Sequence, residues 1–318
     1  MKTQTSYLGI DVSKRKLHLG STNQFMGEFE NDVIGHQKLI ERLVALKPVS
    51  IVLEASGGYE RPVCDALQDA GLPVTVAQPG CVKHYAKSIK VLAKTDKIDA
   101  QMIARFAEGT KPAPTPKTPE NIRRFRAVCD RRTQIVADRV REGNRLETCA
   151  DRDMAKHIQA NLQRLLEMEK ELDQQIDHML ESEEDLQRKA QAMTAQKGVG
   201  VKTASALLAH LPELGSLSRQ QVASIAGVAP HPRESGTWKG KRRIYGGRSE
   251  VRTAMYMAAK TAAMWCPVIR EFYLRLRANG KSYNQAIIAC ARKMLVRLNT
   301  ILKEMNQPIP APHGAQTT

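Results

Sequence analysis

Four acidic residues among the first 100 positions have the types and spacing of a metal site. Asp11 follows the apolar run YLGI, and Glu54 ends a second run, SIVLE. Asp96 and Asp99 are three residues apart in KTDKIDAQMIARF, which puts both on one face of a helix. Clustered carboxylates need cations to neutralise them, and oxygen ligands without His or Cys select Mg²⁺ or Mn²⁺. Two such ions can stabilise attack and departure at a phosphodiester.

Each acid has a plainer interpretation when it is considered by itself. An Asp after a strand is often a turn residue, and Asp96 is also placed to cap its helix. Glu60 competes with Glu54, but it follows Gly57-Gly58-Tyr59 and has the position of a first-turn helix residue. Two acids at strand ends together with an Asp-x-x-Asp helix favour the metal site over these alternatives.

Ser235 is the candidate nucleophile. It precedes a glycine in the basic segment HPRESGTWKGKRRIYGGR, so its backbone is exposed and adaptable. Nearby cations would bind a scissile phosphate and stabilise the charge that develops during attack. The residues alone favour a turn serine beside a phosphate-binding loop over a nucleophile, and that alternative stays open. The cations in question are Arg233, Lys239, Lys241, Arg242, Arg243 and Arg248.

The elements that would position the four acids have an α/β pattern over residues 1–110. Short strands are predicted at 7–12, 16–21, 24–30, 50–54 and 73–77, and helices at 36–46, at 59–70 and after Pro79. Three strands followed by alternating helix and strand predict a mixed sheet, the order of an RNase H-like (RuvC-like) fold. Asp11 and Glu54 would end two central strands at the same edge.

The rest of the chain is predicted to be mostly α-helical. Residues 111–119 form a proline-rich linker, 120–190 a helical coiled-coil region, 191–305 a second domain, and 306–318 a disordered tail. In the middle region, apolar residues alternate in steps of three and four, interrupted only by Glu169, as in a coiled coil or helical hairpin. These residues are Ile158, Leu162, Leu165, Leu172, Ile176 and Met179.

The charge distribution indicates a polyanionic partner. The net charge is +16 and the pI about 9.7, and residues 196–318 carry 19 Lys and Arg against 5 Asp and Glu. We assign nucleic-acid contacts to the cations around Ser235, to helix 121–148 and to the turn before residue 201, whose amides can hold a phosphate. A salt-paired helix face and a plain helix-start turn are the alternatives. The residues assigned in these two segments are Arg123, Arg124, Arg131, Arg132, Gly198, Gly200 and Lys202.

Several classes of protein are excluded by what the sequence lacks. No run approaches the length of a membrane span, and the N-terminus has no signal-peptide pattern, so we expect a cytoplasmic protein. The 6 cysteines form no CxxC pair, which argues against zinc and for free thiols. No P-loop motif is present, so ATP is not expected as a cofactor.

Six segments resemble the conserved blocks of one family. GIDVSK at 9–14, LEASGGYE at 53–60 and KTDKIDAQMIA at 94–104 resemble the three blocks of the DEDD transposases of bacterial insertion sequences of the IS110 family, relatives of the Piv DNA invertase. KGVGVKTASALLA and IAGVAPHPRESG resemble that family's C-terminal transposase domain, as does GGRSEVRTAMYMAA. The resemblance runs from about residue 5 to 300, and it is weakest in the helical middle.

The resemblance implies a specific chemistry. It implies an RuvC-like domain in which Asp11, Glu54, Asp96 and Asp99 bind Mg²⁺, and a catalytic serine that falls on Ser235. It also implies insertion and excision of DNA guided by a structured non-coding bridge RNA that pairs with target and donor DNA. The partners would be both DNAs, the RNA and further copies of the chain, as a dimer and as a tetramer in the synapse, with the metal site and the serine meeting across subunits.

Two other functions fit the same residues. A metal-dependent nuclease of the Holliday-junction type would use the four acids to activate water, with Ser235 as a structural residue. A non-catalytic nucleic-acid-binding protein would bind without Mg²⁺ and cut nothing. A recombinase with a 5′-phosphoserine intermediate is our prediction, and loss of cleavage on Ser235→Ala separates it from both.

Overall fold

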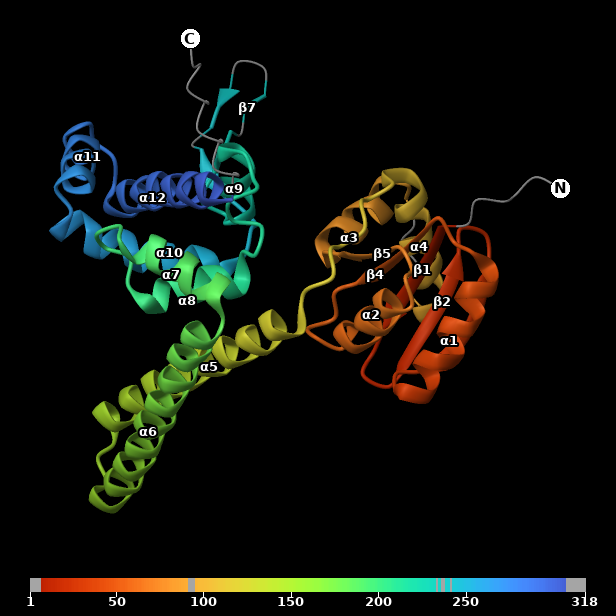
Figure 1. The fold of residues 1–318 in the computed structure, drawn as a ribbon, viewed down its shortest axis with the longest axis horizontal. Coiled ribbons are helices and arrows are strands. Elements are labelled where there is room, and N and C mark those ends of the chain that lie inside the picture. Colours follow the sequence, from red (N-terminus) through yellow and green to blue (C-terminus); the bar gives the residue numbers. More distant parts are fainter. Residues whose placement is uncertain (1–6, 91–94, 233, 236–237, 241, 307–318) are drawn as a thin grey trace, which may run out of the picture. The chain divides into compact units, whose positions relative to one another are not determined.

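The chain folds into two compact units, residues 1–118 and 119–318. The structure, a computed structural model, describes residues 7–90, 95–232, 234–235, 238–240 and 242–306 (Figure 1). Within these ranges no helix is long and apolar enough to cross a membrane. All six cysteines lie in the described part and are free thiols.

The first unit is built on a mixed five-stranded sheet with the strand order β3-β2-β1-β4-β5. Strands β1, β2 and β3 are antiparallel neighbours, whereas β4 pairs in parallel with both β1 and β5. This is the predicted α/β architecture with a mixed sheet, and two of the predicted helices start or end within a residue of their observed bounds. The elements are β1 (Tyr7–Val12), β2 (Lys16–Ser21), β3 (Phe25–Glu30), α1 (Val33–Leu46), β4 (Ser50–Glu54), α2 (Glu60–Asp69), β5 (Val74–Ala77), α3 (Pro79–Ser88) and α4 (Asp96–Thr110).

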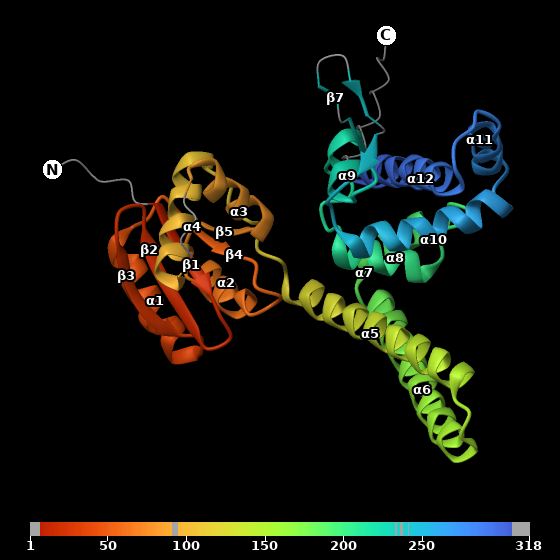
Figure 2. The ribbon, with the colours of Figure 1, turned by 180° about the vertical axis from the view of Figure 1, so that it is seen from behind.

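The two faces of this sheet carry different side chains because successive residues of a strand point to opposite sides. One face holds Leu8, Ile10, Leu17, Leu19, Ile51 and Leu53, which form a core with α1 and α2. On the other face Val52 packs with Met102 and Ile103 of α4 and with Val82 of α3. Helices α3 and α4 therefore cover the face opposite to α1 and α2 (Figures 1 and 2).

Helix α4 lies close against the sheet because two glycines leave room for it. A Cβ on Gly9 of β1 would overlap backbone atoms of Ala100 and Ala104 and lie 2.8 Å from Ile103 Cβ. A Cβ on Gly20 of β2 would lie 2.8 Å from the Ala100 carbonyl carbon. The contact with both strands fixes the position of the first turn of α4 relative to the end of β1.

The proline-rich segment 111–119 runs along the outer edge of β5. The Thr115 amide donates to Val74 O at 2.8 Å, and the Val76 amide donates to Thr115 Oγ1 at 3.0 Å. The Thr75 hydroxyl donates to Ala113 O at 3.0 Å. Prolines at alternate positions leave the amide of Thr115 free to bond with the strand. The segment predicted as a linker therefore also covers an otherwise open sheet edge.

The second unit begins with a helical hairpin of α5 (Glu120–Thr148) and α6 (Arg152–Ser182). The apolar positions predicted for α6 do form one side of it: Leu165 and Ile176 are buried, and Ile176 packs in one cluster with Phe125 and Cys129 of α5. The predicted seam is thus a hairpin contact within one chain. These buried side chains are not exposed for a second subunit.

Glu169 interrupts the apolar series because it pairs with two arginines of α5. Its carboxylate accepts from Arg132 Nη2 at 3.0 Å and from Arg139 Nε at 2.8 Å, and only 14% of its side chain is exposed. Arg132 also bonds Asp173, the carboxylate that pairs with Lys202 at 2.9 Å. The helix pair is therefore held by ion pairs along the same side that packs its apolar residues.

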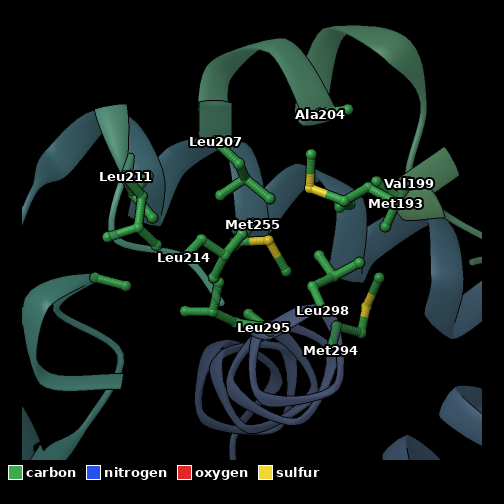
Figure 3. Packing of buried hydrophobic residues seen from close by; sticks show 14 of the residues in the cluster. Met193, Val199, Ala204, Leu207, Leu211, Leu214, Met255, Met294, Leu295 and Leu298 are labelled. Carbon is green, nitrogen blue, oxygen red and sulfur yellow. The ribbon is translucent and has the colours of Figure 1, made fainter. Parts of the chain in front are cut away.

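Helices from the remainder of the second unit share one aliphatic core. Met193, Leu207, Met255 and Leu298 pack together from four helices, and few aromatic side chains take part (Figure 3). These helices are α7 (Glu184–Thr194), α8 (Val201–His210), α9 (Arg219–Ile225), α10 (Ser249–Trp265), α11 (Pro267–Ala278) and α12 (Tyr283–Met305).

Candidate active site

Asp11 and Glu54 end neighbouring parallel strands on the same face of the sheet. The β1–β4 register pairs Gly9 with Val52 and Ile10 with Leu53, so the next pair is Asp11 beside Glu54. Gly9 and Val52 both face α4, and alternation gives Asp11 and Glu54 the same direction. Both carboxylates therefore lie at the same edge of the sheet, as predicted, and on the side that α4 covers.

Asp96 and Asp99 lie in the first turn of α4, one turn before the residues that contact the sheet. Asp96 precedes Ala100 by four residues, and Asp99 precedes Ile103 by four. Each acid is therefore on the same side of the helix as a residue that contacts Gly9 of β1. Asp96 is not the cap, because the Thr95 hydroxyl accepts from the Ile98 amide at 3.3 Å. Two acids in a first turn also interact favourably with the helix dipole.

His18 of β2 was not predicted as part of this site, although its imidazole lies within 4.0 Å of the carboxylates of Asp11, Glu28 and Asp96. Its Nδ1 is 4.0 Å from Asp11 Oδ2, and its Nε2 is 3.9 Å from Asp96 Oδ2 and 3.3 Å from Glu28 Oε2. The β1–β2 register pairs His18 with Asp11. A signal was present in the sequence: only three residues, 13–15, join the two strands, and so short a connection fixes which residues face each other.

Glu60, the competitor of Glu54, holds the loop that follows β4. Its Oε2 accepts from the Ser56 amide at 2.9 Å, the Gly58 amide at 2.8 Å and the Ser56 hydroxyl at 3.0 Å, and the residue is buried. Burial by itself raises the pKa of this carboxyl, but the three donors outweigh it and lower the pKa below its ordinary value. Glu60 therefore has a structural role that occupies its carboxylate.

The donor types at this edge suit a hard divalent cation. Asp11 and Glu54 face α4 from β1 and β4, Asp96 and Asp99 lie in the first turn of α4, and oxygen donors of this kind select Mg²⁺ or Mn²⁺. The buried Nδ1 of His18 has no hydrogen-bond partner in the described part of the chain, so a polar atom remains unsatisfied beside Asp11. As the described side chains are arranged, no three His, Cys, Asp or Glu residues form a complete ligand set. The four acids fit a divalent ion because their carboxylate oxygens are the donors it prefers and because they lie on the same side of the sheet.

Ser235 lies in a small β-ribbon, which was not predicted for this basic segment. Its strand β7 (Glu234–Ser235) pairs with β8 (Trp238–Lys239), and β6 (Pro230–His231) pairs with β9 (Arg243–Ile244) in a second ladder. The register sets Ser235 opposite Trp238. Strands of two residues cannot show the alternation that identifies a strand in sequence. Arg233 and Lys241 lie outside the described residues.

Arg248 ties the end of this ribbon to the helical core. Its guanidinium donates to both carboxylate oxygens of Glu213 at 2.7 Å and to His210 O at 2.8 Å, and its amide donates to Ile225 O at 2.7 Å. Burial alone raises the pKa of Glu213, but the hydrogen bonds from Arg248 outweigh it and lower that pKa. Next to it, Gly227 and Gly247 are in backbone contact, with no room for a Cβ on either. Arg248 thus has a structural role beside the proposed contact with nucleic acid.

The other residues proposed to contact phosphate include exposed arginines and the two glycines of the turn before α8. Arg124, Arg131, Arg242 and Arg243 are exposed. Gly198 has a positive φ of 95° and touches Ala262 of α10, so packing accounts for this glycine. Gly200 is the N-cap of α8, and open space surrounds the position where its Cβ would be. The turn at 198–200 therefore has one structural glycine and one at an accessible helix start.

Two family models match this chain. One, the DEDD model of IS110 elements, is described as a transposase and matches residues 8–155. The other is described as the transposase of the IS116/IS110/IS902 family and matches residues 190–274. All four acids lie within the first match, and Ser235 lies within the second.

Curated relatives extend the likeness over nearly the whole chain. The pilin gene-inverting proteins of Moraxella bovis and Moraxella lacunata are each 26% identical over 315 residues, which is 95% of this chain and 97% of each relative. An uncharacterized 43.6 kDa protein of insertion element IS110 from Streptomyces coelicolor is 34% identical over 114 residues, or 35% of this chain and 28% of that protein. The likeness to the gene-inverting proteins spans both units of the fold.

Proposed function

This chain belongs to the IS110 family of transposases and is related to the pilin gene-inverting proteins, and from that premise we propose that it is an RNA-guided DNA recombinase acting through a 5′-phosphoserine intermediate. Its family makes it a DNA recombination enzyme. The observation that carries the finer proposal is that Asp11 and Glu54 end neighbouring strands on the face covered by α4, the helix whose first turn holds Asp96 and Asp99.

The four acids are proposed to hold Mg²⁺ or Mn²⁺. When bound, the ion would supply Lewis-acid stabilisation of the charge on the phosphate. Asp11 and Glu54 are anchored on the adjacent strands β1 and β4, and Asp96 and Asp99 on a helix that packs closely against β1 at Gly9 and against β2 at Gly20. Rigid elements of this kind keep carboxylates in place for binding.

Ser235 is proposed to make the covalent step. Its Oγ forms a bond to the phosphorus of a DNA phosphodiester and loses its proton, while the bond from phosphorus to the 3′ oxygen breaks. The 3′ oxygen leaves as a hydroxyl after taking up a proton, and the 5′ phosphate remains as a serine ester. A 3′-hydroxyl from the recombined strand reverses the ester. Bond energy is conserved, which agrees with a sequence that has no P-loop.

Target DNA, donor DNA and a bridge RNA are the proposed partners. Base pairing with the RNA would choose the sequences, and the protein would bind backbones through its basic residues. The exposed cations of the ribbon, such as Arg242 and Arg243, and those of α5, such as Arg124 and Arg131, support this assignment. Holding two DNA molecules requires several copies of the chain, and we propose a dimer that pairs into a tetramer.

A metal-dependent nuclease is the second candidate, because all four acids lie in the first unit and Ser235 in the second. A recombination assay on a plasmid with target and donor sites tests whether the recombinase needs the four acids. We expect single changes of Asp11, Glu54, Asp96 or Asp99 to Ala to abolish recombination. Glu108→Ala, an exposed acid on the same helix α4, should leave it unchanged. Normal recombination in the four variants would refute the proposed metal site.

A further inference from the structure

His18 is a buried polar residue on a face of the sheet that α4 covers. Its neighbours Leu17 and Leu19 belong to the opposite core, with α1 and α2, so alternation directs His18 toward α4 and the four acids. Only 7% of its side chain is exposed. A histidine this deeply buried needs polar partners, and it is one of few buried polar side chains in this unit.

The partners of the imidazole are carboxylates from three different elements. Nε2 lies 3.3 Å from Oε2 of Glu28 on β3 and 3.9 Å from Oδ2 of Asp96 on α4. Nδ1 lies 4.0 Å from Oδ2 of Asp11 on β1, and within the described residues this buried atom makes no hydrogen bond. The ring of Phe25 packs nearby, with its centroid 6.2 Å from that of the imidazole. The ring therefore stands between two of the proposed metal ligands.

Glu28 keeps one side of the imidazole in place. It is opposite His18 in the β2–β3 register and also bonds the ammonium of Lys16, which lowers the pKa of Glu28. A carboxylate held in this way fixes the Nε2 side of the ring. The Nδ1 side is then left facing Asp11.

We propose that His18 is a positioning residue of the acidic site, which sets the carboxylates of Asp11 and Asp96 for the metal ion. This inference rests on the proposed function. Ligating carboxylates are commonly oriented by hydrogen bonds from a second layer of residues, and losing such a partner typically weakens metal binding 10- to 100-fold. Since Mg²⁺ and Mn²⁺ prefer oxygen, the imidazole supports the ligands and is not itself one of them.

A titration of the full chain with Mn²⁺ tests this role without any DNA. The electron paramagnetic resonance signal of free Mn²⁺ gives the affinity. His18→Leu, which keeps the bulk and removes both ring nitrogens, should weaken binding about tenfold. His18→Asn should recover most of the loss, because its amide nitrogen takes the place of Nδ1. Unfolding temperatures of both variants, measured without Mn²⁺, show that the fold is kept.

His36→Leu is the matched control. His36 is a buried histidine of α1, the helix that packs on the opposite face of the sheet from α4, and its Nε2 lies 2.8 Å from Asn31 Oδ1. It should bind Mn²⁺ like the unchanged chain. Unchanged affinity in His18→Leu, a loss equalled by His36→Leu, or a loss that His18→Asn does not recover would each overturn the inference. Normal Mn²⁺ binding by Asp11→Ala would instead refute the metal site of the proposed function.

Discussion

Gly9 of β1 is in direct contact with Ala100 of α4, so closely that a Cβ on the glycine would overlap the Ala100 carbonyl oxygen. This contact places the first turn of α4, with its two acids, beside the end of β1. We expect Gly9→Ala to push α4 from the sheet and to destabilise the first unit by about 1–3 kcal/mol. Thermal unfolding measures this, with Gly80→Ala, where a Cβ meets open space, as the control. Equal unfolding temperatures for Gly9→Ala and the unchanged chain would contradict the close contact.

Glu54 is predicted to be needed for recombination, and Glu60 is predicted to be needed for the stability of the fold. Glu54→Gln should abolish recombination with little change in unfolding temperature. Glu60→Gln should lower the unfolding temperature, because it weakens the bonds to Ser56 and Gly58 that hold the loop. Lost recombination in Glu60→Gln and a lowered unfolding temperature in Glu54→Gln would show instead that Glu60 is the catalytic acid.

The contribution of Glu60 to stability is also predicted to depend on pH. The pKa of Glu60 in the folded protein lies below its ordinary value of 4.5, so its contribution is fully present above pH 4.5. That contribution is lost as the pH falls through the folded value. The difference in unfolding temperature between the unchanged chain and Glu60→Gln should therefore shrink below pH 4.5. A difference that stays constant down to pH 3 would contradict this coupling.

Glu169→Leu is predicted to destabilise the α5–α6 hairpin even though it completes the apolar series of α6. The change leaves Arg139 without its carboxylate and Arg132 with Asp173 alone, in a half-buried place, at a cost of about 1–3 kcal/mol. Glu171→Leu, an exposed position on the same helix, is the control. If Glu169→Leu unfolds at a higher temperature, the seam is dominated by apolar contacts and not by these ion pairs.

Arg243 and Arg248 should behave differently although both were predicted to bind nucleic acid. Arg243 is exposed, and Arg243→Ala should reduce the slope of log affinity against log salt by about 0.9 while the unfolding temperature stays the same. Arg248→Ala removes the paired bonds to Glu213 and should lower the unfolding temperature. Fluorescence anisotropy with labelled DNA and a thermal melt distinguish them. An unchanged slope in Arg243→Ala would remove this residue from the proposed interface.

The sequence predicted the first unit well because its strands show clear alternation and its turns are short. The run SIVLE ends where β4 ends, and the helix predicted to carry Asp96 and Asp99 begins at Asp96, directly after Thr95, which caps it. Helix α1 begins earlier than predicted, at Val33, because Asp32 caps it and the first-turn residues Val33 and Ile34 are exposed. Local patterns of this kind depend on neighbours along the chain, which the sequence supplies.

Contacts between distant residues were much harder to predict. Arg248 with Glu213 and Glu169 with Arg132 and Arg139 join different elements, and nothing in the spacing of these residues marks them as pairs. For this reason the sequence alone could not decide whether the arginines of α5 form salt bridges or bind phosphate. His18 was overlooked for the opposite reason, since its strand was predicted correctly but its partner across the ladder was not considered.

A covalent-trapping experiment tests the central claim most directly. The protein is incubated with RNA from the flanks of its element, labelled target and donor DNA, and Mg²⁺, then denatured and separated by size. We predict a labelled protein–DNA adduct that is absent with Ser235→Ala and with Asp96→Ala, because the ester needs both the serine and the acidic site. Cleaved DNA without any adduct, formed equally well by Ser235→Ala, would contradict the account and identify a hydrolytic nuclease.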